Sequence, residues 1–411
     1  MHIDLNSCFA TVEQQANPNL RGKPMVVAAY VENHGCILAA SREAKQFGIK
    51  TGMRVWEGKQ IFPKLIVLPP DPEKYRFVNH QLERLLSEYS SELSVESIDE
   101  MVLQLKNSSI VSIAKEIKQR IKNEIGEWLT VSIGIAPNRY LAKVASSLHK
   151  PDGLDVIDKS NIEEVFSNLA LEDLCGIKEG YGGRLRATGI ATPLNFYHTS
   201  PIALKRAFRS VVGYGWWLRL HGWEGGTHNE QFKATEQPQK SFGQSYAFGK
   251  PYLPAEPALH QILSQLVVKM GRRLRADGFI AGGIGTSCLF VDHTYWQHHV
   301  KQSVSLFADI DLYTAALKIL QQGPDKPVRI LTVHCFDLTK TLYQQESLLS
   351  DEDRKVRLTQ ALDAIHDRWG DFMVTSGRML GMEPASTRRE PGRVQRGEHK
   401  VLDRIAFGGV K

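Results

Sequence analysis

A polar stretch from Glu224 to Gln239 divides the 411-residue sequence into two parts, each with its own pattern of strands and helices. The stretch is rich in Gly, His, Gln and Glu and has few apolar residues, which is typical of a linker. Single domains usually contain about 100 to 200 residues, so we expect two to four domains in this chain. Hydrophobic residues make up 42% of the sequence, enough to give each domain a core.

The part after the linker predicts the order β-α-β-β-α-β, which is that of a ferredoxin-like unit. Its strands are predicted at residues 240–248, 283–292, 299–307 and 328–338, and its helices at residues 257–276 and 311–321. An amphipathic helix follows, with an apolar stripe formed by Leu358, Ala361, Leu362, Ile365 and Trp369. The tail from Glu383 onward is polar and basic.

The part before the linker predicts an α+β layer around a short opening strand. Strands are predicted at residues 1–5, 93–97, 101–105 and 129–135. Only Ile98, Asp99 and Glu100 separate the second strand from the third, which predicts a tight hairpin with two acids at its bend. We therefore expect Asp4, in the opening strand, to lie beside Asp99 and Glu100.

Asp4, Asp99 and Glu100 are candidate ligands of divalent metal ions. Carboxylates gathered at one sheet edge repel one another unless a cation lies between them. Hard oxygen ligands suit Mg²⁺ or Mn²⁺, and two such ions ~3.5 to 4 Å apart can activate a hydroxyl and stabilise a leaving oxygen. The cluster therefore predicts phosphoryl or nucleotidyl transfer, although each acid taken singly is more often a solvated turn or cap residue.

The charge of the chain favours a polyanionic partner such as nucleic acid. Lys and Arg exceed Asp and Glu by 51 to 45, which gives a net charge of +6. Basic residues recur in clusters that predict a long basic track: Arg184/Arg186, Lys205/Arg206/Arg209, Arg272/Arg273/Arg275 and Arg388/Arg389/Arg393/Arg396.

The sequence has no motif for a zinc site, a disulfide framework, a membrane span or a secretion signal. The five cysteines lie far apart without C-x-x-C spacing, which indicates neither a zinc site nor a disulfide framework. No apolar run approaches the ~20 residues that cross a bilayer, and the N-terminus does not resemble a secretion signal. We therefore expect a cytoplasmic protein with no membrane contact.

A series of motifs, spread in order over about residues 1 to 370, resembles the Y family of translesion DNA polymerases, close to the bacterial polymerase IV and V groups. The motifs are residues 2–10 (HIDLNSCFA), 41–45 (SREAK), 97–100 (SIDE), 134–138 (GIAPN) with 141–143 (LAK), 150–153 (KPDG) and 240–243 (KSFG). The sequence leaves open which of the two bacterial groups the chain belongs to.

The resemblance implies a right hand with a ferredoxin-like palm, small fingers, a helical thumb and a little finger. The ranges are 1–7 and 70–157 for the palm, 8–69 for the fingers, 158–223 for the thumb, 224–239 for the linker, 240–340 for the little finger and 341–411 for a C-terminal helix and basic tail. It further implies low-fidelity, DNA-templated DNA synthesis that copies damaged template in DNA repair, by a monomer without a proofreading exonuclease.

The same resemblance implies roles for residues of the active site. Asp4, Asp99 and Glu100 would hold two Mg²⁺ ions, with the backbone carbonyl of Leu5 as a further ligand. Phe9 would be the steric gate that excludes a ribose 2′-hydroxyl, although it could also be a packed aromatic between fingers and palm.

Three cations are implied as contacts of the dNTP triphosphate. Arg42 and Lys45 are one helical turn apart and can face the same side. The family more often has Tyr at the position of Arg42 and Arg at that of Lys45. Lys150 matches the family lysine that contacts the triphosphate, and its alternative role is a charge at the end of a helix.

Contacts with primer–template DNA are implied in the second half of the chain. In the thumb, Gly176 and Gly180 belong to a helix-hairpin-helix whose amides hold phosphates, or to a merely structural helical hairpin; Lys178 stands where the family has glycine. In the little finger the backbone contacts would be Lys240, Ser241, Arg272, Arg273 and Arg275, with solvated charge as the alternative.

A peptide at Gln345, Leu348 and Leu349 resembles the segment with which bacterial relatives bind the sliding clamp, and its alternative role is a plain connector. Two rival functions share part of this pattern. A non-catalytic scaffold of the same family would have lost its carboxylates, and all three are present. Another palm-type nucleotidyltransferase, such as a nucleotide cyclase, would need neither thumb nor little finger, and the basic C-terminal half disfavours it.

Overall fold

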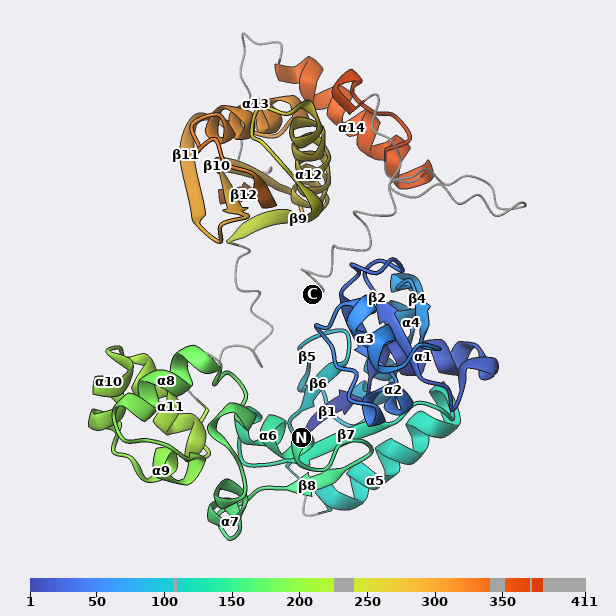
Figure 1. The fold of residues 1–411 in the computed structure, drawn as a ribbon, viewed down its shortest axis with the longest axis vertical. Helices are drawn as coiled ribbons and strands as arrows, with labels where there is room; N and C mark the ends of the chain where they lie inside the picture. The colour runs from blue at the N-terminus through green and yellow to red at the C-terminus, as the bar shows by residue number, and fades with distance from the viewer. Residues whose placement is uncertain (107–108, 225–239, 341–351, 370–371, 380–411) are drawn as a thin grey trace. The chain divides into compact units, whose positions relative to one another are not determined.

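The computed structural model describes residues 1–106, 109–224, 240–340, 352–369 and 372–379. These residues form two compact units, and the chain divides between them within the predicted linker (Figure 1). Across the described ranges, no helix has both the length and the apolar character to cross a membrane.

The N-terminal unit is built on a five-stranded sheet with the strand order β5-β6-β1-β7-β8. The strands are β1 (His2–Leu5), β5 (Leu93–Val95), β6 (Glu100–Leu103), β7 (Val131–Ile135) and β8 (Leu154–Val156). The central strand β1 pairs antiparallel with β6 and with β7, whereas β8 runs parallel to β7. Every residue of β1 and β7 is buried, because helices cover both faces of the sheet.

The two faces of this sheet differ in chemistry because successive side chains on a strand point to opposite sides. On one face, Ile3 and Leu5 belong to a hydrophobic core completed by helices α4 and α5. On the other face, His2 meets a serine of helix α6. These helices are α4 (Pro72–Ser87), α5 (Ile110–Arg120), which continues into the π-helical turn η2 (Ile121–Ile125), and α6 (Arg139–Leu148).

Gly134 allows α6 to lie directly against the sheet. A Cβ atom at this position would lie 2.0 Å from the Ala142 carbonyl oxygen and 2.3 Å from the Ser146 amide nitrogen, so any other residue would push the helix away. The sequence therefore fixes the distance at which the polar face of α6 approaches His2 and its neighbours on β1 and β6.

A small three-stranded sheet, ordered β3-β2-β4, lies within the range predicted for the fingers. Its strands are β2 (Met25–Ala28), β3 (Ile37–Ala40) and β4 (Ile66–Leu68), and the helices of this range are α1 (Cys8–Ala16), η1 (Pro18–Leu20), α2 (Arg42–Gln46) and α3 (Val55–Ile61). Ala10 of α1 packs against Met25 and Val27, which joins α1 to this sheet.

The region predicted as the thumb is helical, as its composition indicates. It contains α7 (Ile162–Ser167), η3 (Leu171–Asp173), α8 (Glu179–Ala187), α9 (Pro193–His198), α10 (Pro201–Phe208) and α11 (Val212–Leu220). These helices share one hydrophobic core with α6, which contributes Leu141, Val144 and Ala145 to it. One face of α6 therefore packs on the five-stranded sheet, and another packs on the helices of the predicted thumb.

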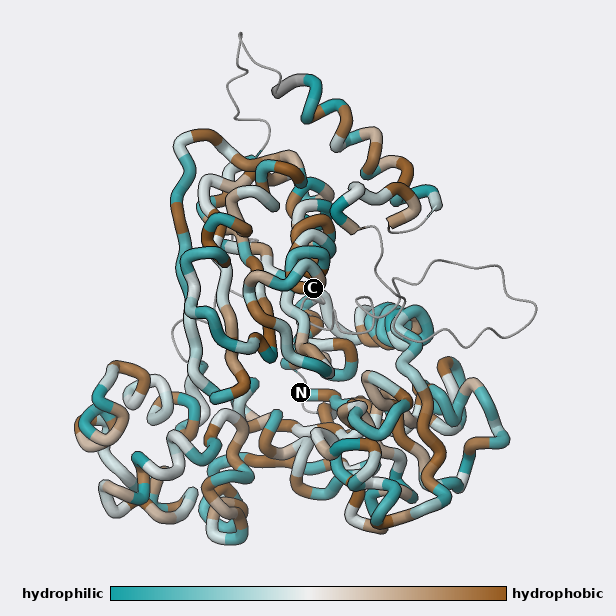
Figure 2. The backbone as a smooth tube through the Cα atoms, turned by 45° about the horizontal axis from the view of Figure 1, so that its top comes forward, coloured by the Kyte–Doolittle hydropathy of each residue, from teal (hydrophilic) through white to brown (hydrophobic). Residues whose placement is uncertain are grey.

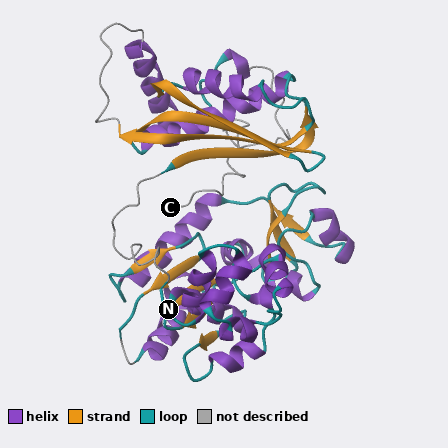
Figure 3. Cartoon of the chain, turned by 90° about the vertical axis from the view of Figure 1, so that its left-hand side faces the viewer, coloured by secondary structure: helices purple, strands orange, loops and turns teal. Residues whose placement is uncertain are grey.

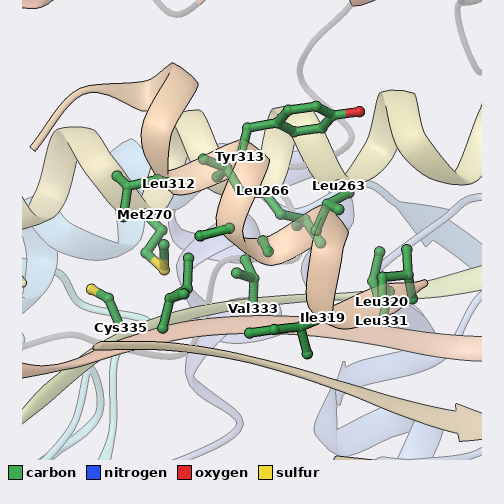
Figure 4. Close-up of a cluster of buried hydrophobic side chains, with 14 of the residues drawn as sticks. Leu263, Leu266, Met270, Leu312, Tyr313, Ile319, Leu320, Leu331, Val333 and Cys335 are labelled. Atoms are coloured by element: carbon green, nitrogen blue, oxygen red, sulfur yellow. The ribbon is translucent and has the colours of Figure 1, made fainter. Parts of the chain in front are cut away.

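The C-terminal unit confirms the predicted β-α-β-β-α-β order. Its elements are β9 (Ser241–Tyr252), α12 (Pro257–Ala276), β10 (Phe279–Phe290), β11 (Tyr295–Leu306), α13 (Asp309–Leu320) and β12 (Val328–Lys340). The strands form an antiparallel sheet ordered β11-β10-β12-β9, and α12 and α13 cover one of its faces (Figure 3). Leu263 and Leu266 of α12, Leu312 of α13 and Val333 of β12 are part of the core between them (Figure 4).

The predicted C-terminal helix is present as α14 (Glu352–Trp369), followed by the turn η5 (Gly377–Met379). Hydrophobic and hydrophilic residues alternate along it (Figure 2). Its apolar stripe is exposed: Leu358 is 61% and Trp369 59% accessible, while Thr359 and His366 are buried. The helix is held instead by carboxylates that meet the arginines of α12, so ion pairs and not the stripe decide which face is packed.

Candidate active site

The strands β1 and β6 lie side by side in the five-stranded sheet (Figure 1), and they bring Asp4 and Glu100 together, with Asp99 directly before β6, as the hairpin predicts. Asp4 lies directly opposite Glu100 across the antiparallel pair β1 and β6, so both side chains are on the same face. The amide of Leu5 donates a hydrogen bond of 2.9 Å to the carbonyl oxygen of Asp99, which holds the bend against the end of β1.

Cationic side chains from the α6 region neutralise two of these carboxylates. Lys150 Nζ lies 2.6 Å from Asp4 Oδ2, and Lys143 donates a hydrogen bond to Glu100 Oε2. His2 Nε2, which is buried, lies 3.5 Å from the same oxygen of Glu100. Contact with His2 and then with Lys143 lowers the pKa of Glu100 to about 2 and outweighs the opposite effect of burial.

Asp99 is in a different electrostatic position. Burial raises the pKa of its carboxyl above the usual range, and the negative charges of Asp4 and Glu100 add to this effect. A hydrogen bond of 2.6 Å from Ser97 Oγ opposes it. Burial raises the pKa of the neighbouring Cys8 thiol, and the negative charges of Asp99 and Asp4 raise it further. The three carboxylates therefore interact electrostatically, as neighbours of like charge do.

The donor chemistry of this cluster suits a divalent cation. Within the described ranges, no three His, Cys, Asp or Glu side chains converge closely enough to ligate a metal in their present orientations. Ammonium groups contact Asp4 and Glu100 in this structure. The oxygen ligands are nevertheless all present beside one another, and hard cations select such ligands. The predicted role of the Leu5 carbonyl stays a prediction.

The three cations predicted to bind a triphosphate lie near one another and near Asp4. Lys45 Nζ donates to Ser7 Oγ over 2.8 Å, and Arg42 Nη2 donates to Thr130 Oγ1. Burial lowers the pKa of Lys45, and the charges of Lys150 and Arg42 lower it further, whereas Asp4 raises it. The residues therefore form a positive cluster beside Asp4, and such a cluster suits an anionic ligand.

Phe9 stacks on a tyrosine that is itself firmly anchored. The rings of Phe9 and Tyr75 are 4.3 Å apart between centroids and 17° from parallel. Tyr75 is fully buried, and its hydroxyl donates a hydrogen bond of 3.0 Å to Glu13, which also binds Lys74. Phe9 is therefore a packed aromatic, as the alternative interpretation holds, and it remains partly exposed in the first turn of α1. Its gate role stays a prediction.

The predicted thumb hairpin connects η3 to α8. Gly176 has a φ of 85°, a conformation that suits glycine, and Gly180 lies in the first turn of α8 with open space around it. Lys178, which replaces the glycine of the family, has an extended backbone with φ −125°, so its side chain causes no strain. The hairpin is thus formed, and its contact with DNA stays a prediction.

The predicted DNA contacts of the C-terminal unit have unequal surroundings. Lys240 and Ser241 are exposed at the start of β9. The side chain of Arg275 is only 4% exposed and binds Asp363 and Asp309, and Arg272 binds Asp367 over 2.7 Å. These two arginines hold α14, and their N–H groups already donate to carboxylates whose negative charge offsets their own. Their geometry therefore favours a structural role over a contact with DNA phosphate. The clamp residues Gln345, Leu348 and Leu349 lie outside the described residues.

Two residues that the sequence interpretation passed over have a place in this site. His2 and Lys143 both contact Glu100. Each belongs to a motif already noted, and His2 could have been found by strand periodicity, because it is two residues from Asp4 on one strand.

Comparison with known proteins gives matches over both units. The model of the impB/mucB/samB family matches residues 3–147, and that of the C-terminal domain of the same family matches residues 239–348. The DNA polymerase IV of Pelotomaculum thermopropionicum is 29% identical over 397 residues, which are 95% of this chain and 96% of that relative. DNA polymerase IV 1 of Bacillus subtilis is 30% identical over 406 residues, with 94% of each chain covered.

Solved structures agree in fold. A Y-family DNA polymerase chimaera of Dbh and Dpo4 matches with a TM-score of 0.69 and 24% identity, covering 82% of this chain and 98% of the other. An insertion ternary complex of Dbh DNA polymerase matches with a TM-score of 0.53. This likeness confirms the predicted multi-domain polymerase fold. With relatives of 30% identity along nearly its whole length, the chain belongs to the impB/mucB/samB family, the Y-family translesion DNA polymerases, and is a DNA-directed DNA polymerase.

Proposed function

We propose that this enzyme extends a DNA primer on a DNA template by two-metal nucleotidyl transfer. The observation that carries the proposal is the pairing of Asp4 with Glu100, with Asp99 at the adjoining bend and three cations beside them. Acidic ligands next to a basic cluster suit a reaction in which a metal-bound triphosphate is cleaved.

Asp4, Asp99 and Glu100 would hold the ions, with Mg²⁺ as the expected metal and Mn²⁺ as a substitute. Bound there, the ions would supply the positive charge that activates the primer 3′-hydroxyl and stabilises the pyrophosphate leaving group. Lys150 and Lys143 contact these carboxylates, so both must give up their ion pairs for the site to fill. Lys150 would then be available for the phosphates.

The remaining residues would position the nucleotide and the DNA. Arg42, Lys45 and Lys150 would bind the triphosphate, and the ring of Phe9 would lie under the sugar and exclude a 2′-hydroxyl. Backbone amides of the thumb hairpin and the exposed start of β9 would contact DNA phosphates without reading sequence. Family membership supports low fidelity, lesion bypass and a role in damage tolerance, and docking to the sliding clamp through residues 345–349 is part of the same proposal.

Primer extension on an undamaged template with Mg²⁺ and dNTPs tests the central claim. The wild type should extend the primer, and Asp99→Ala/Glu100→Ala should not. Removal of the metal with EDTA should stop extension, and added Mg²⁺ should restore it. Binding of the same primer–template, measured by fluorescence anisotropy, should survive in the variant. Extension by neither protein, with DNA binding intact, would favour a non-catalytic scaffold.

A further inference from the structure

Asn6 is a buried amide directly after β1, two residues beyond Asp4. It is 4% exposed, and its side chain makes three hydrogen bonds. Its Oδ1 accepts from Thr130 Oγ1 at 3.2 Å and from the backbone amide of Asp152 at 2.7 Å. Its Nδ2 donates to Ser132 Oγ at 2.9 Å. Both ends of the amide are therefore satisfied, as burial of a polar side chain requires.

Each bond to Oδ1 leads to one of the cations assigned to the triphosphate. Thr130, whose hydroxyl binds Asn6, also accepts a hydrogen bond from Arg42 on helix α2. The amide of Asp152 belongs to the loop that begins with Lys150, and Lys150 reaches back to Asp4. A single oxygen atom thus lies between a fingers residue and a palm loop that are far apart in the sequence.

A third bond fixes the orientation of the amide. Ser132 on β7 accepts from Asn6 Nδ2 and also from the backbone amide of Gly153, over 3.3 Å. The loop is therefore held at Asp152 by the oxygen of Asn6 and at Gly153 through Ser132. Because the two anchors are consecutive peptide units, the direction in which Lys150 leaves the loop is also constrained.

We propose that Asn6 is a positioning residue for nucleotide binding, which sets Arg42 and Lys150 at the spacing that a triphosphate bridges. The inference rests on the proposed function, since it assumes that these cations bind the nucleotide. Asn6 acts through its neighbours, so its replacement should weaken the binding of dNTP and leave the rate of the metal-dependent chemical step unchanged. Arranging charges before the ligand arrives lowers the cost of binding.

Steady-state insertion of a single dNTP by the full chain tests the inference. Asn6→Leu removes all three bonds at similar volume, and Thr130→Val removes the branch to Arg42 alone. Both should raise KM for dNTP about tenfold while kcat stays within about twofold, since binding and not chemistry is affected. Asn6→Asp should stay within about threefold of the wild type, because its carboxylate accepts from Thr130 and Asp152 and the Ser132 hydroxyl can turn to donate.

The matched control is Asn138→Leu. Asn138 is also 4% exposed and also makes three side-chain hydrogen bonds, with Leu141, Arg219 and Trp223 at the junction with the thumb. Its replacement should lower thermal stability as much as Asn6→Leu does, without the rise in KM. A rise in KM that is equal in both variants, or a loss of kcat alone in Asn6→Leu, would overturn the positioning role.

A double variant separates this inference from the proposed function. If Thr130 acts through Arg42, then Thr130→Val/Arg42→Ala should bind dNTP little worse than Arg42→Ala, whereas independent effects would multiply. Multiplied effects would refute the branch through Thr130. If Arg42→Ala and Lys150→Ala both leave KM unchanged, the triphosphate assignment itself is wrong and the inference fails with it. A wild type that extends no primer would overturn the proposed function.

Discussion

Asp4 and Glu100 share a face because residues opposite each other on antiparallel strands point to the same side. The sequence allows this to be foreseen, since one strand ends in an acid and one hairpin has acids at its bend. The contacts of His2, Lys143 and Asn6 could not be foreseen in the same way. They depend on how closely α6 and the loop after it approach the sheet, and that distance depends on tertiary packing against Gly134.

Replacing Phe9 with Ala should admit ribonucleotides, because an aromatic ring at this position would occupy the space of a 2′-hydroxyl. The discrimination between dNTP and rNTP, measured as the ratio of kcat/KM values, should fall by at least about tenfold. Tyr75→Ala, which removes the ring stacked on Phe9, should give part of the same loss. Unchanged discrimination in Phe9→Ala would remove the gate role.

At the scale of elements, the backbone contact between β7 and α6 is the feature that assembles the site. Gly134→Ala should displace α6, because the added Cβ would overlap the Ala142 carbonyl oxygen. We expect a loss of about 1–3 kcal/mol in the free energy of unfolding and a loss of primer extension, measured by denaturant titration and gel assay.

The control for this change is Gly183→Ala, a glycine inside α8 with no atom within 4 Å of the added Cβ. It should stabilise the chain by about 0.5–1 kcal/mol, because alanine favours a helix over glycine. Equal behaviour of the two variants would mean that the close approach of α6 at Gly134 is not needed.

The attachment of α14 depends on a buried guanidinium. Arg275→Ala should remove the partner of Asp309 and leave Asp363 with only a 3.9 Å contact to Arg272, and breaking such a buried pair costs about 3–5 kcal/mol. Limited proteolysis should then cut near α14 much earlier than in the wild type. Lys301→Ala, which breaks an exposed pair with Asp337, should leave the cleavage pattern unchanged. Resistance of Arg275→Ala to cleavage would contradict the role of this arginine.

Element boundaries show where the sequence pattern is informative. The order of strands and helices after the linker was predicted, because alternation and helical periodicity are local properties. The strands β9 and β10 are longer than predicted: β9 continues through Pro251, which an edge strand tolerates, and β10 begins at Phe279. The apolar stripe of α14 correctly predicted a helix but not which of its faces is packed. That face is the one whose carboxylates bind arginines of α12.

At the scale of the whole molecule, the peptide at residues 345–349 is the predicted link to a processivity factor. Deleting Gln345 to Leu349 should abolish stimulation of primer extension by the sliding clamp and leave extension without the clamp unchanged. Product lengths on a primed circular template, with and without the clamp, would measure both effects. Stimulation that persists in the deletion variant would place the docking site elsewhere.

The position of α6 has a mechanical consequence. Leu141, Val144 and Ala145 are locked into the core of the thumb, while Lys143 on the same rigid helix holds a carboxylate of the palm. A helix in close packing transmits displacement almost without loss. A movement of the thumb that displaces α6 would therefore act on the ion pair between Lys143 and Glu100, so the position of the thumb and the charge around this carboxylate are coupled.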